Sequence, residues 1–323
     1  MSKLSELFAE LSPVDDPNES NFFAGKPIAD SNHHLAKDVQ GRPVILIRVI
    51  TSGVKAPGLQ LQNLHVNHDI RCRISTASNE AIDDTFSIVR CVSDESETQT
   101  FFLDTMEVVL SRLSAAPSEI EIANFVNHLC FLFSAMSRPP TKTVQALWAE
   151  LFVVRQSHNF AAMVDAWRTE DTDTYDFNFG LRRLEVKSTS GRRRSHYFSY
   201  EQVYPPNQTE AFVASVFVDR VPNGLSLGSL WDEIQGKLDD NDDLRLKLDQ
   251  ICIQSLGADW SEARTVTFDE QLAIESLAFF DVNNIPRVSS EQPIGISEIK
   301  FKASLEQSAP TEAKMIWDFR TSM

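Results

Sequence analysis

The sequence lacks any apolar run long enough to cross a membrane. No stretch approaches the roughly 20 apolar residues that a spanning helix needs. The first residues, Met1–Leu11, predict a short amphipathic helix, without the charged start, apolar run and cleavage site of a signal peptide. We therefore expect a cytoplasmic protein that does not enter a membrane.

Cysteine is scarce and shows no C-x-x-C spacing, so neither a disulfide framework nor a zinc site is expected. The four cysteines are Cys72, Cys91, Cys130 and Cys252, and the seven histidines do not complete a zinc-ligand pattern. We expect the thiols to be reduced and buried. The sequence also has no internal repeat and no low-complexity segment.

Positive charge is in short supply, because 30 Lys and Arg residues stand against 46 Asp and Glu, a formal net charge of −16. Phosphate contacts need Lys and Arg, so this total argues against broad nucleic-acid binding. A local basic patch still acts against an acidic background. The segment 182–194 is such a candidate, because it holds six basic residues and a single acid, Glu185. The basic residues are Arg182, Arg183, Lys187, Arg192, Arg193 and Arg194.

With 323 residues, the chain is more naturally two domains than one. We expect a β-rich N-terminal domain over residues 1–115, where apolar residues alternate or form β-branched runs. The expected strands are Val44–Ile50, Leu59–His65, Ile70–Ile74, Thr85–Val92 and Thr98–Leu103. This part has no catalytic constellation, so binding DNA, binding a partner and supporting the second domain remain open for it.

Residues 116–323 predict a second domain that mixes helices and strands. Ser118, with Glu121 three residues later, matches a capping box, and Arg138-Pro139-Pro140 ends the helix that follows. The strands expected after a second helix form an α/β core. In chain order, the expected elements are a helix over Lys142–His158, strands over Thr174–Phe177, Leu181–Thr189, His196–Tyr200 and Ala211–Val221, helical segments from Leu225 to Leu256 and from Phe268 to Phe279, and a strand over Ile296–Ala303.

Two acids and a lysine in this core, Asp176, Glu185 and Lys187, are side chains of the kinds that catalytic sites use. Side chains alternate along a strand, so Glu185 and Lys187 project from one face and leave the other to Leu184 and Val186. The turn Asn178-Phe179-Gly180 suits a hairpin because Asn and Gly tolerate positive φ. Asp176 then lies opposite Arg183 to Glu185 across the hairpin, so its carboxylate can approach that of Glu185. We expect the face that carries Glu185 to be open.

Two convergent carboxylates suit a divalent cation such as Mg²⁺ or Mn²⁺, which prefers oxygen ligands. Such an ion at Asp176 and Glu185 polarises a phosphodiester, and Lys187 beside it stabilises negative charge on phosphorus. The alternative is a surface set of cross-strand ion pairs without a catalytic role. An Asp followed by Glu-x-Lys is a weak pattern by itself, so the surrounding elements have to support it.

The longer run resembles the PD-(D/E)XK nuclease superfamily, and in particular the bacterial "PD-(D/E)XK motif proteins" found in defence loci. Tyr175 stands where the name-giving Pro would precede the first Asp. The resemblance covers about residues 144–202. Its matching segments are Trp148-Ala-Glu150-Leu, Val164-Asp-Ala-Trp167, Tyr175-Asp-Phe177, Leu184-Glu-Val-Lys-Ser188, Arg194-Ser-His196 and Ser199-Tyr-Glu-Gln202.

The resemblance implies a restriction-endonuclease-like αβββαβ core and DNA cleavage in defence against phage, beside a Z1-domain protein and a MutL-like ATPase. It also implies that Glu150 is an accessory acid near the metal, although a helix-face ion pair is an equal alternative. For His196 and Gln202 it implies DNA contact or support of the site. The second function class is a DNA-binding or scaffold subunit that keeps the fold without cleaving.

The basic residues near the site are the expected contacts to the DNA backbone. Arg183 lies on the strand of the site, and Arg192, Arg193 and Arg194 lie in the turn that follows it. A solvated turn is the alternative for these three arginines.

Overall fold

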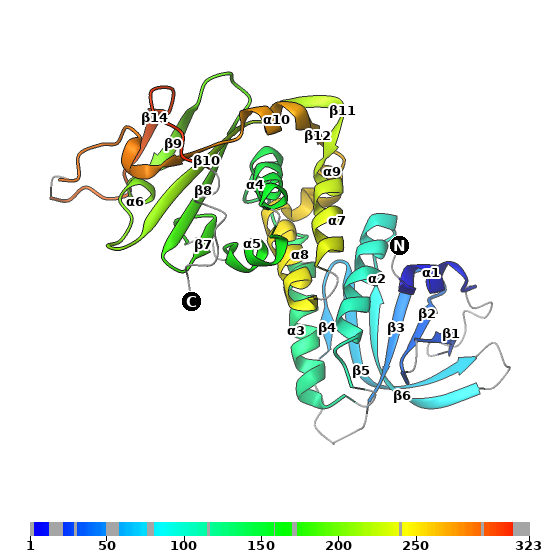
Figure 1. Ribbon diagram of the computed structural model, residues 1–323. Coiled ribbons are helices and arrows are strands. Elements are labelled where there is room, and N and C mark those ends of the chain that lie inside the picture. The colour runs from blue at the N-terminus through cyan, green and yellow to red at the C-terminus, as the bar shows by residue number, and fades with distance from the viewer. Residues whose placement is uncertain are drawn as a thin grey trace. The chain divides into compact units, whose positions relative to one another are not determined.

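The computed structural model describes residues 3–12, 22–28, 31–49, 58–75, 81–114, 117–157, 159–169, 173–238, 241–291 and 294–312. The chain divides into two compact units, Met1–Arg138 and Pro139–Met323. The expected boundary was near residue 115, and the division falls later because the helix Glu119–Ala135 belongs to the first unit. The mixed α/β class is confirmed (Figure 1).

The first unit is a small barrel-like sheet with helices beside it. The strands pair in the order β1-β2-β3-β6-β5-β4, and a parallel pairing between β1 and β5 closes the sheet on itself. An apolar cluster that includes Phe23, Leu46 and Phe86 forms its core. Its elements are α1 (Lys3–Ala9), β1 (Phe22–Pro27), β2 (His34–Lys37), β3 (Pro43–Arg48), β4 (Leu59–Gln60), β5 (Leu64–Ser75), β6 (Ala81–Cys91), α2 (Ser96–Leu110) and α3 (Glu119–Ala135).

Two expected strands of this unit are wrong. The expected strand Leu59–His65 is divided, because a turn at residues 61–63 separates β4 from β5, and the two strands then pair antiparallel. The other, Thr98–Leu103, lies within helix α2. The local sequence favours a strand through its threonines and phenylalanines. The buried positions continue past this segment to Met106, Val109 and Leu110, and 15 residues form one helix. Apolar residues that recur over such a length follow the helical period, which the short window of the strand prediction did not include.

The second unit has a four-stranded sheet in the order β13-β10-β8-β7, with β8 and β10 parallel. Strand β9 lies outside this sheet and pairs with β14. The elements of the second unit are α4 (Val144–Gln156), α5 (Phe160–Ala166), β7 (Phe177–Phe179), β8 (Arg182–Thr189), β9 (Ser195–Ser199), α6 (Tyr200–Val203), β10 (Glu210–Phe217), β11 (Arg220–Ser226), α7 (Leu227–Lys237), α8 (Asp242–Leu256), η1 (Gly257–Asp259), α9 (Trp260–Arg264), β12 (Thr267–Phe268), α10 (Glu270–Ser276), β13 (Ala278–Asp281), η2 (Val282–Asn284) and β14 (Lys300–Ser304).

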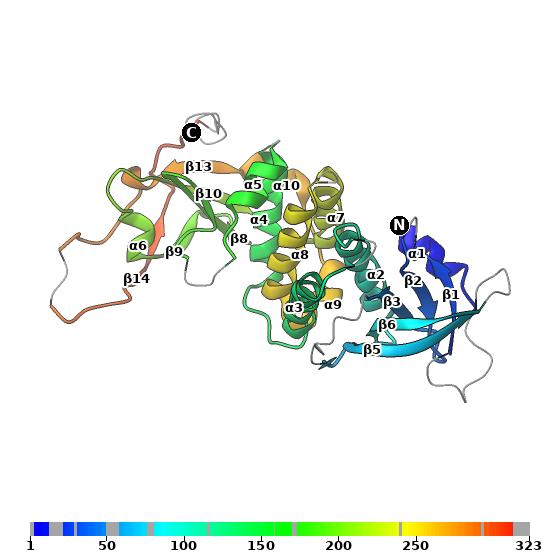
Figure 2. The same ribbon diagram turned by 90° about the horizontal axis from the view of Figure 1, so that it is seen from below.

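The helix starts follow from capping side chains. Ser118 and Glu121 form the predicted capping box of α3, which is therefore confirmed. At α4 the Thr143 hydroxyl accepts a hydrogen bond from the Ala146 amide. Helix α4 lies against one side of the sheet, while β9, α6 and β14 lie on the other (Figures 1 and 2). Both sides of the sheet are therefore covered.

The hairpin that positions the site differs from the expected one by a small shift. Strand β7 covers Phe177–Phe179, so the loop is Gly180 and Leu181 rather than Asn178-Phe179-Gly180. Gly180 has φ of +57° at the first position of this two-residue loop, where a type II′ turn requires glycine. The turn fixes the register in which Phe177 pairs with Leu184.

Within the described residues, no helix is both long and apolar enough to cross a bilayer.

We predict that Gly180→Ala lowers the free energy of unfolding of the second unit by about 1–2 kcal/mol, the cost of a left-handed conformation with a Cβ. All five tryptophans lie after Arg138, so denaturation followed by tryptophan fluorescence reports on this unit. The control is Gly236→Ala in α7, where a Cβ would meet nothing within 4 Å. Helix propensity makes that control neutral or slightly stabilising. Equal stability of Gly180→Ala and wild type would contradict the role of this turn.

Candidate functional site

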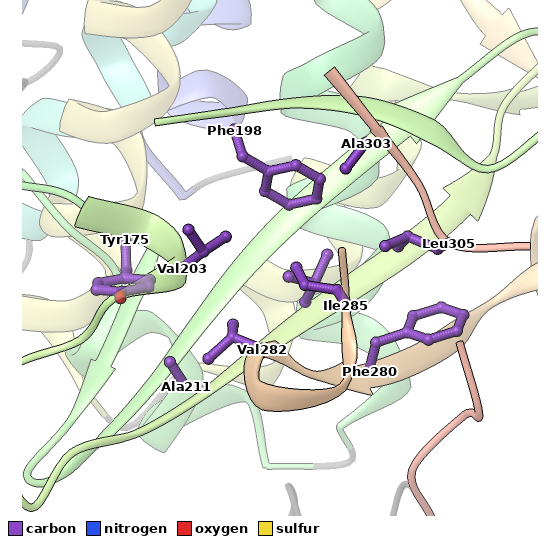
Figure 3. Close-up of a cluster of buried hydrophobic side chains, with 10 residues drawn as sticks. Tyr175, Phe198, Val203, Ala211, Phe280, Val282, Ile285, Ala303 and Leu305 are labelled. Atoms are coloured by element: carbon purple, nitrogen blue, oxygen red, sulfur yellow. The ribbon is translucent and has the colours of Figure 1, made fainter. Parts of the chain in front are cut away.

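Glu185 lies on a covered face of the sheet, so the expectation of an open face is wrong. Its neighbour in the parallel strand β10 is Val213, whose side chain therefore points to the same face. Val213 belongs to an apolar cluster that β9, α6, η2 and β14 complete (Figure 3). Glu185 retains only 5% of its accessible surface beside this cluster. Its carboxylate is thus held in a largely dehydrated environment.

Lys187 projects from the same face of β8 and is paired with Glu185. Its Nζ lies 2.7 Å from Glu185 Oε1 and 5.5 Å from the centre of the Phe198 ring. The lysine side chain keeps 19% of its accessible surface, so its amine reaches the edge of the site. The second oxygen of the glutamate, Oε2, is buried and has no hydrogen-bond partner among the described residues. A buried carboxylate oxygen without a donor is costly unless a bound cation or a proton neutralises it.

Asp176 precedes β7 and is brought to β8 by the hairpin. Its Oδ2 accepts a hydrogen bond from the Val186 amide at 2.8 Å. Its Oδ1 lies 3.4 Å from a guanidinium nitrogen of Arg168 and 3.8 Å from Lys142 Nζ. The residue is 3% exposed, and the Arg168 amide donates to its carbonyl, which ties the segment before the hairpin in place.

Glu150 brings a third buried carboxylate to this region from helix α4. Lys142 Nζ lies 2.7 Å and 2.6 Å from its two oxygens, and the Trp167 indole donates to Oε2 at 2.9 Å. Lys142 thereby stands between Glu150 and Asp176. Glu150 therefore makes the ion pair of the second alternative, while it also lies close enough to Asp176 to be perturbed by that charge. Its predicted role as an accessory acid near a metal stays a prediction.

Burial and the charge of Asp176 perturb both buried glutamates. Burial, followed by the negative charge of Asp176, raises the pKa of Glu185 well above its ordinary value, and Lys187 opposes this rise. Burial and Asp176 likewise raise the pKa of Glu150 against the opposing effect of Lys142. For Lys142, burial lowers the pKa, but Glu150 and Asp176 outweigh it and leave the pKa raised. Paired carboxylates with raised pKa values are typical of functional sites.

The donor set suits a hard divalent cation in part. Asp176 and Glu185 provide carboxylate oxygens, the ligands that Mg²⁺ prefers, and Glu185 Oε2 lacks a partner in the described part of the chain. Within that same part, no three acidic, histidine or cysteine side chains gather closely enough to form a metal-binding cluster. An Mg²⁺ ion held by one or two carboxylates and water needs no such cluster.

Two of the predicted DNA-contacting arginines are exposed in the connection between β8 and β9. Arg192 is paired with Asp219 at 2.8 Å, with 64% of its side chain accessible. Arg193 is also exposed. Arg183 instead bends back to the hairpin, where it donates to the carbonyls of Gly180 and Arg182. Arg192 and Arg193 therefore remain available to an external anion.

The other three predicted contact residues serve internal roles. The Arg194 guanidinium donates to the carbonyl and hydroxyl of Ser215 and to the carbonyl of Ser276. His196 is hydrogen-bonded to Ser215, and burial lowers its pKa to about 4, with nearby cations adding to the effect. Gln202 completes the capping box of α6 and donates to the Thr174 carbonyl. These three side chains therefore hold neighbouring strands and turns of the second unit together through internal hydrogen bonds.

The residues that sequence reasoning missed are Lys142, Arg168 and the indole of Trp167. Lys142 precedes α4 and reaches Glu150 eight residues later, a spacing that does not follow the helical pairing rule. Trp167 was expected in the core, where it is buried, but its indole also donates to Glu150. The hydrogen bond from the Arg168 amide to the Asp176 carbonyl arises in the tertiary fold and leaves no local pattern.

We predict that Glu185→Gln flattens the pH dependence of stability between about pH 5 and pH 8. The raised pKa means that the folded chain holds a proton that the unfolded chain has released, so the free energy of unfolding falls as pH rises through this range. The glutamine variant lacks this loss, which is on the order of 2 kcal/mol. Denaturation at a series of pH values measures it.

The matched control for this prediction is Glu262→Gln, an exposed glutamate of α9. Other buried groups, including His196 and Asp249, titrate in wild type and in both variants, so they cancel in the comparison. A Glu185→Gln profile parallel to that of wild type would show that Glu185 does not titrate in this way.

Comparison with known proteins gives one match. The model of a family described as "Putative PD-(D/E)XK family member, (DUF4420)" matches residues 4–306. No curated protein and no solved structure matches the chain. The match includes Asp176, Glu185 and Lys187, and it confirms the predicted relationship to the superfamily. Because it covers nearly the whole chain, the protein belongs to this PD-(D/E)XK family.

Proposed function

We propose that this protein hydrolyses phosphodiester bonds of DNA with the help of a divalent cation, Mg²⁺ or Mn²⁺. The observation that carries the proposal is the juxtaposition of Glu185 and Lys187, 2.7 Å apart, with a buried glutamate oxygen that lacks a partner in the described part of the chain. Family membership supports a nuclease-like function. Asp176 and Glu185 are the proposed metal ligands.

In the proposed reaction, Asp176 and Glu185 would hold the divalent cation, which when bound would supply Lewis-acid polarisation of the scissile phosphate. Lys187 stabilises the negative charge that develops on the phosphate oxygens, because its amine reaches the edge of a largely dehydrated site. Glu150 and Lys142 hold Asp176 in place through the ion pairs of Lys142. The Val186 amide fixes the orientation of the Asp176 carboxylate.

The order of elements supports the proposed restriction-endonuclease-like core. A helix, three strands, a helix and a strand follow one another as α4, β7, β8, β9, α6 and β10, with the short helix α5 inserted after α4. The pairing of β9 with β14 rather than with β8 departs from a simple meander of three strands. The proposal therefore rests on element order and side-chain placement rather than on a complete match of strand pairing.

A non-cleaving DNA-binding or scaffold subunit is the second candidate, and one observation favours it. Lys187, Lys142 and Arg168 already pair with the acids, so the set approaches internal charge balance without a metal. We propose a place in a multi-protein phage-defence system for either candidate, with a Z1-domain protein and a MutL-like ATPase as partners. Arg192 and Arg193 are the proposed contacts to DNA phosphates.

We predict that Lys187→Ala lowers the rate of DNA cleavage by about 10²–10³, the typical value of one well-placed charge in a transition state. The assay uses Mg²⁺ or Mn²⁺, the full chain and the candidate partner proteins. The matched control is Lys237→Ala, which removes an exposed lysine at the end of α7. A Lys187→Ala protein that is folded and cleaves as fast as wild type would overturn the proposal.

We predict that Mg²⁺ or Mn²⁺ raises the Tm of wild type but not that of Asp176→Asn. The cation favours the folded state by mass action, by about 2.7 kcal/mol at a hundredfold excess over its Kd. The asparagine can still accept the hydrogen bond of the Val186 amide while it loses the charge that binds metal. Calorimetric scans with and without metal measure the shift. Equal shifts in both proteins would exclude Asp176 as a ligand.

A further inference from the structure

Strands β9 and β14 form a two-stranded antiparallel ribbon beside the site. Their register places Tyr197 opposite Lys302 and Ser199 opposite Lys300. Side chains alternate along each strand, so the ribbon has two distinct faces. The inner face carries His196, Phe198 and Ala303, all buried against the rest of the unit.

The outer face of the ribbon combines an exposed aromatic ring with two cations. Tyr197 keeps 67% of its accessible surface, and Lys302 Nζ lies 5.4 Å from the centre of its ring. Lys300 is exposed on the same face of β14, two residues before Lys302 and so about 7 Å from it along the strand. A large aromatic ring so open to solvent gains nothing from burial in the core, and the charged group that lies over it is the Lys302 amine.

This face stands out against the charge of the whole chain. The net charge is −16, yet the outer face of the ribbon carries only lysines as charged groups, and exposed Arg193 lies in the connection that enters β9. Two acids flank β14, Glu298 before it and Glu306 after it. The Glu306 carboxylate already accepts a hydrogen bond from the Arg194 amide. The local field therefore favours an anionic partner.

The inner face links the ribbon to the chemistry. The Phe198 ring lies under the Lys187 amine, 5.5 Å from its centre, and His196 is hydrogen-bonded to Ser215 of β10. Nucleic acid held on the outer face is thus separated from Lys187 by the thickness of the β9–β14 ribbon.

We propose that the outer face of the β9–β14 ribbon binds single-stranded DNA, with a base stacked on Tyr197 and phosphates at Lys300 and Lys302. The proposal rests on the proposed function, since it specifies the form of substrate that reaches the same site. Aromatic side chains flanked by cations are a stacking platform for unpaired bases. A paired base in a duplex has its faces covered by its neighbours and cannot use the Tyr197 ring, so this face selects an unpaired strand.

The test of the stacking contact is binding of a fluorescent single-stranded oligodeoxynucleotide, measured by anisotropy in EDTA so that no cleavage occurs. Tyr197→Ala is expected to weaken binding roughly 5- to 150-fold, the range for one stacked base. Tyr197→Phe keeps the ring and is expected to bind within about twofold of wild type. Because Tyr197 is exposed, neither variant alters the core, and tryptophan fluorescence checks that both are folded.

The phosphate contacts are tested by Lys300→Ala and Lys302→Ala, with Lys237→Ala as the control that removes the same charge elsewhere in the unit. Each ribbon lysine is expected to reduce the slope of log affinity against log salt by about 0.7, the value for one phosphate contact in single strands. Lys237→Ala is expected to leave the slope unchanged. Equal slopes in all four proteins would overturn the phosphate contacts.

The outcomes separate this inference from the proposed function. Binding that is unchanged in Tyr197→Ala, or equally tight binding of a duplex of the same sequence, overturns the inference and leaves the nuclease proposal standing. Single-strand binding that depends on Tyr197, in a protein that cleaves no DNA, supports the inference and contradicts the nuclease proposal. No binding of any oligonucleotide by wild type overturns the ribbon proposal.

Discussion

Burial of three carboxylates in one region is the constraint around which the second unit is built. Glu150, Asp176 and Glu185 each keep 5% or less of their accessible surface. An unpaired buried charge costs several kcal/mol, so such a set persists only with partners. Lys142, Arg168 and Lys187 supply them, yet Glu185 Oε2 still lacks a donor in the described residues. A divalent ion at Glu185 would compete with Lys187 for the carboxylate and so release the lysine amine toward a substrate.

The fold of the second unit buries these carboxylates by covering both faces of its four-stranded sheet. Helix α4 supplies Glu150 from one side, and the apolar cluster around Phe198 and Val213 dehydrates Glu185 from the other. The same strand that brings Phe198 to Lys187 turns Tyr197 outward, because side chains alternate along β9. One element thus connects the buried site to an exposed cationic surface, which matters in a chain whose total charge repels nucleic acid.

Local sequence patterns predicted much of the fold and the elements at the centre of the site. The capping box at Ser118, the helix that holds Glu150 and the hairpin between Asp176 and Glu185 follow from spacing and turn chemistry within a few residues. Burial of Glu185 did not follow, because its cover comes partly from β14, more than 100 residues further along the chain. The helix over Thr98–Leu103 was missed because a short window favours a strand where a longer one shows the helical period. Lys142 and Arg168 meet the acids only through tertiary packing.

The central claim is that Asp176 and Glu185 share a divalent cation, and a crystal soaked in Mn²⁺ tests it most directly. Anomalous scattering identifies the ion without dependence on any assay of activity. The account predicts one peak with oxygens of both carboxylates at roughly 2.0–2.3 Å, and Lys187 displaced from Glu185. Saturating Mn²⁺ that leaves no peak there, with the Lys187–Glu185 pair intact, would contradict it and favour the non-cleaving subunit.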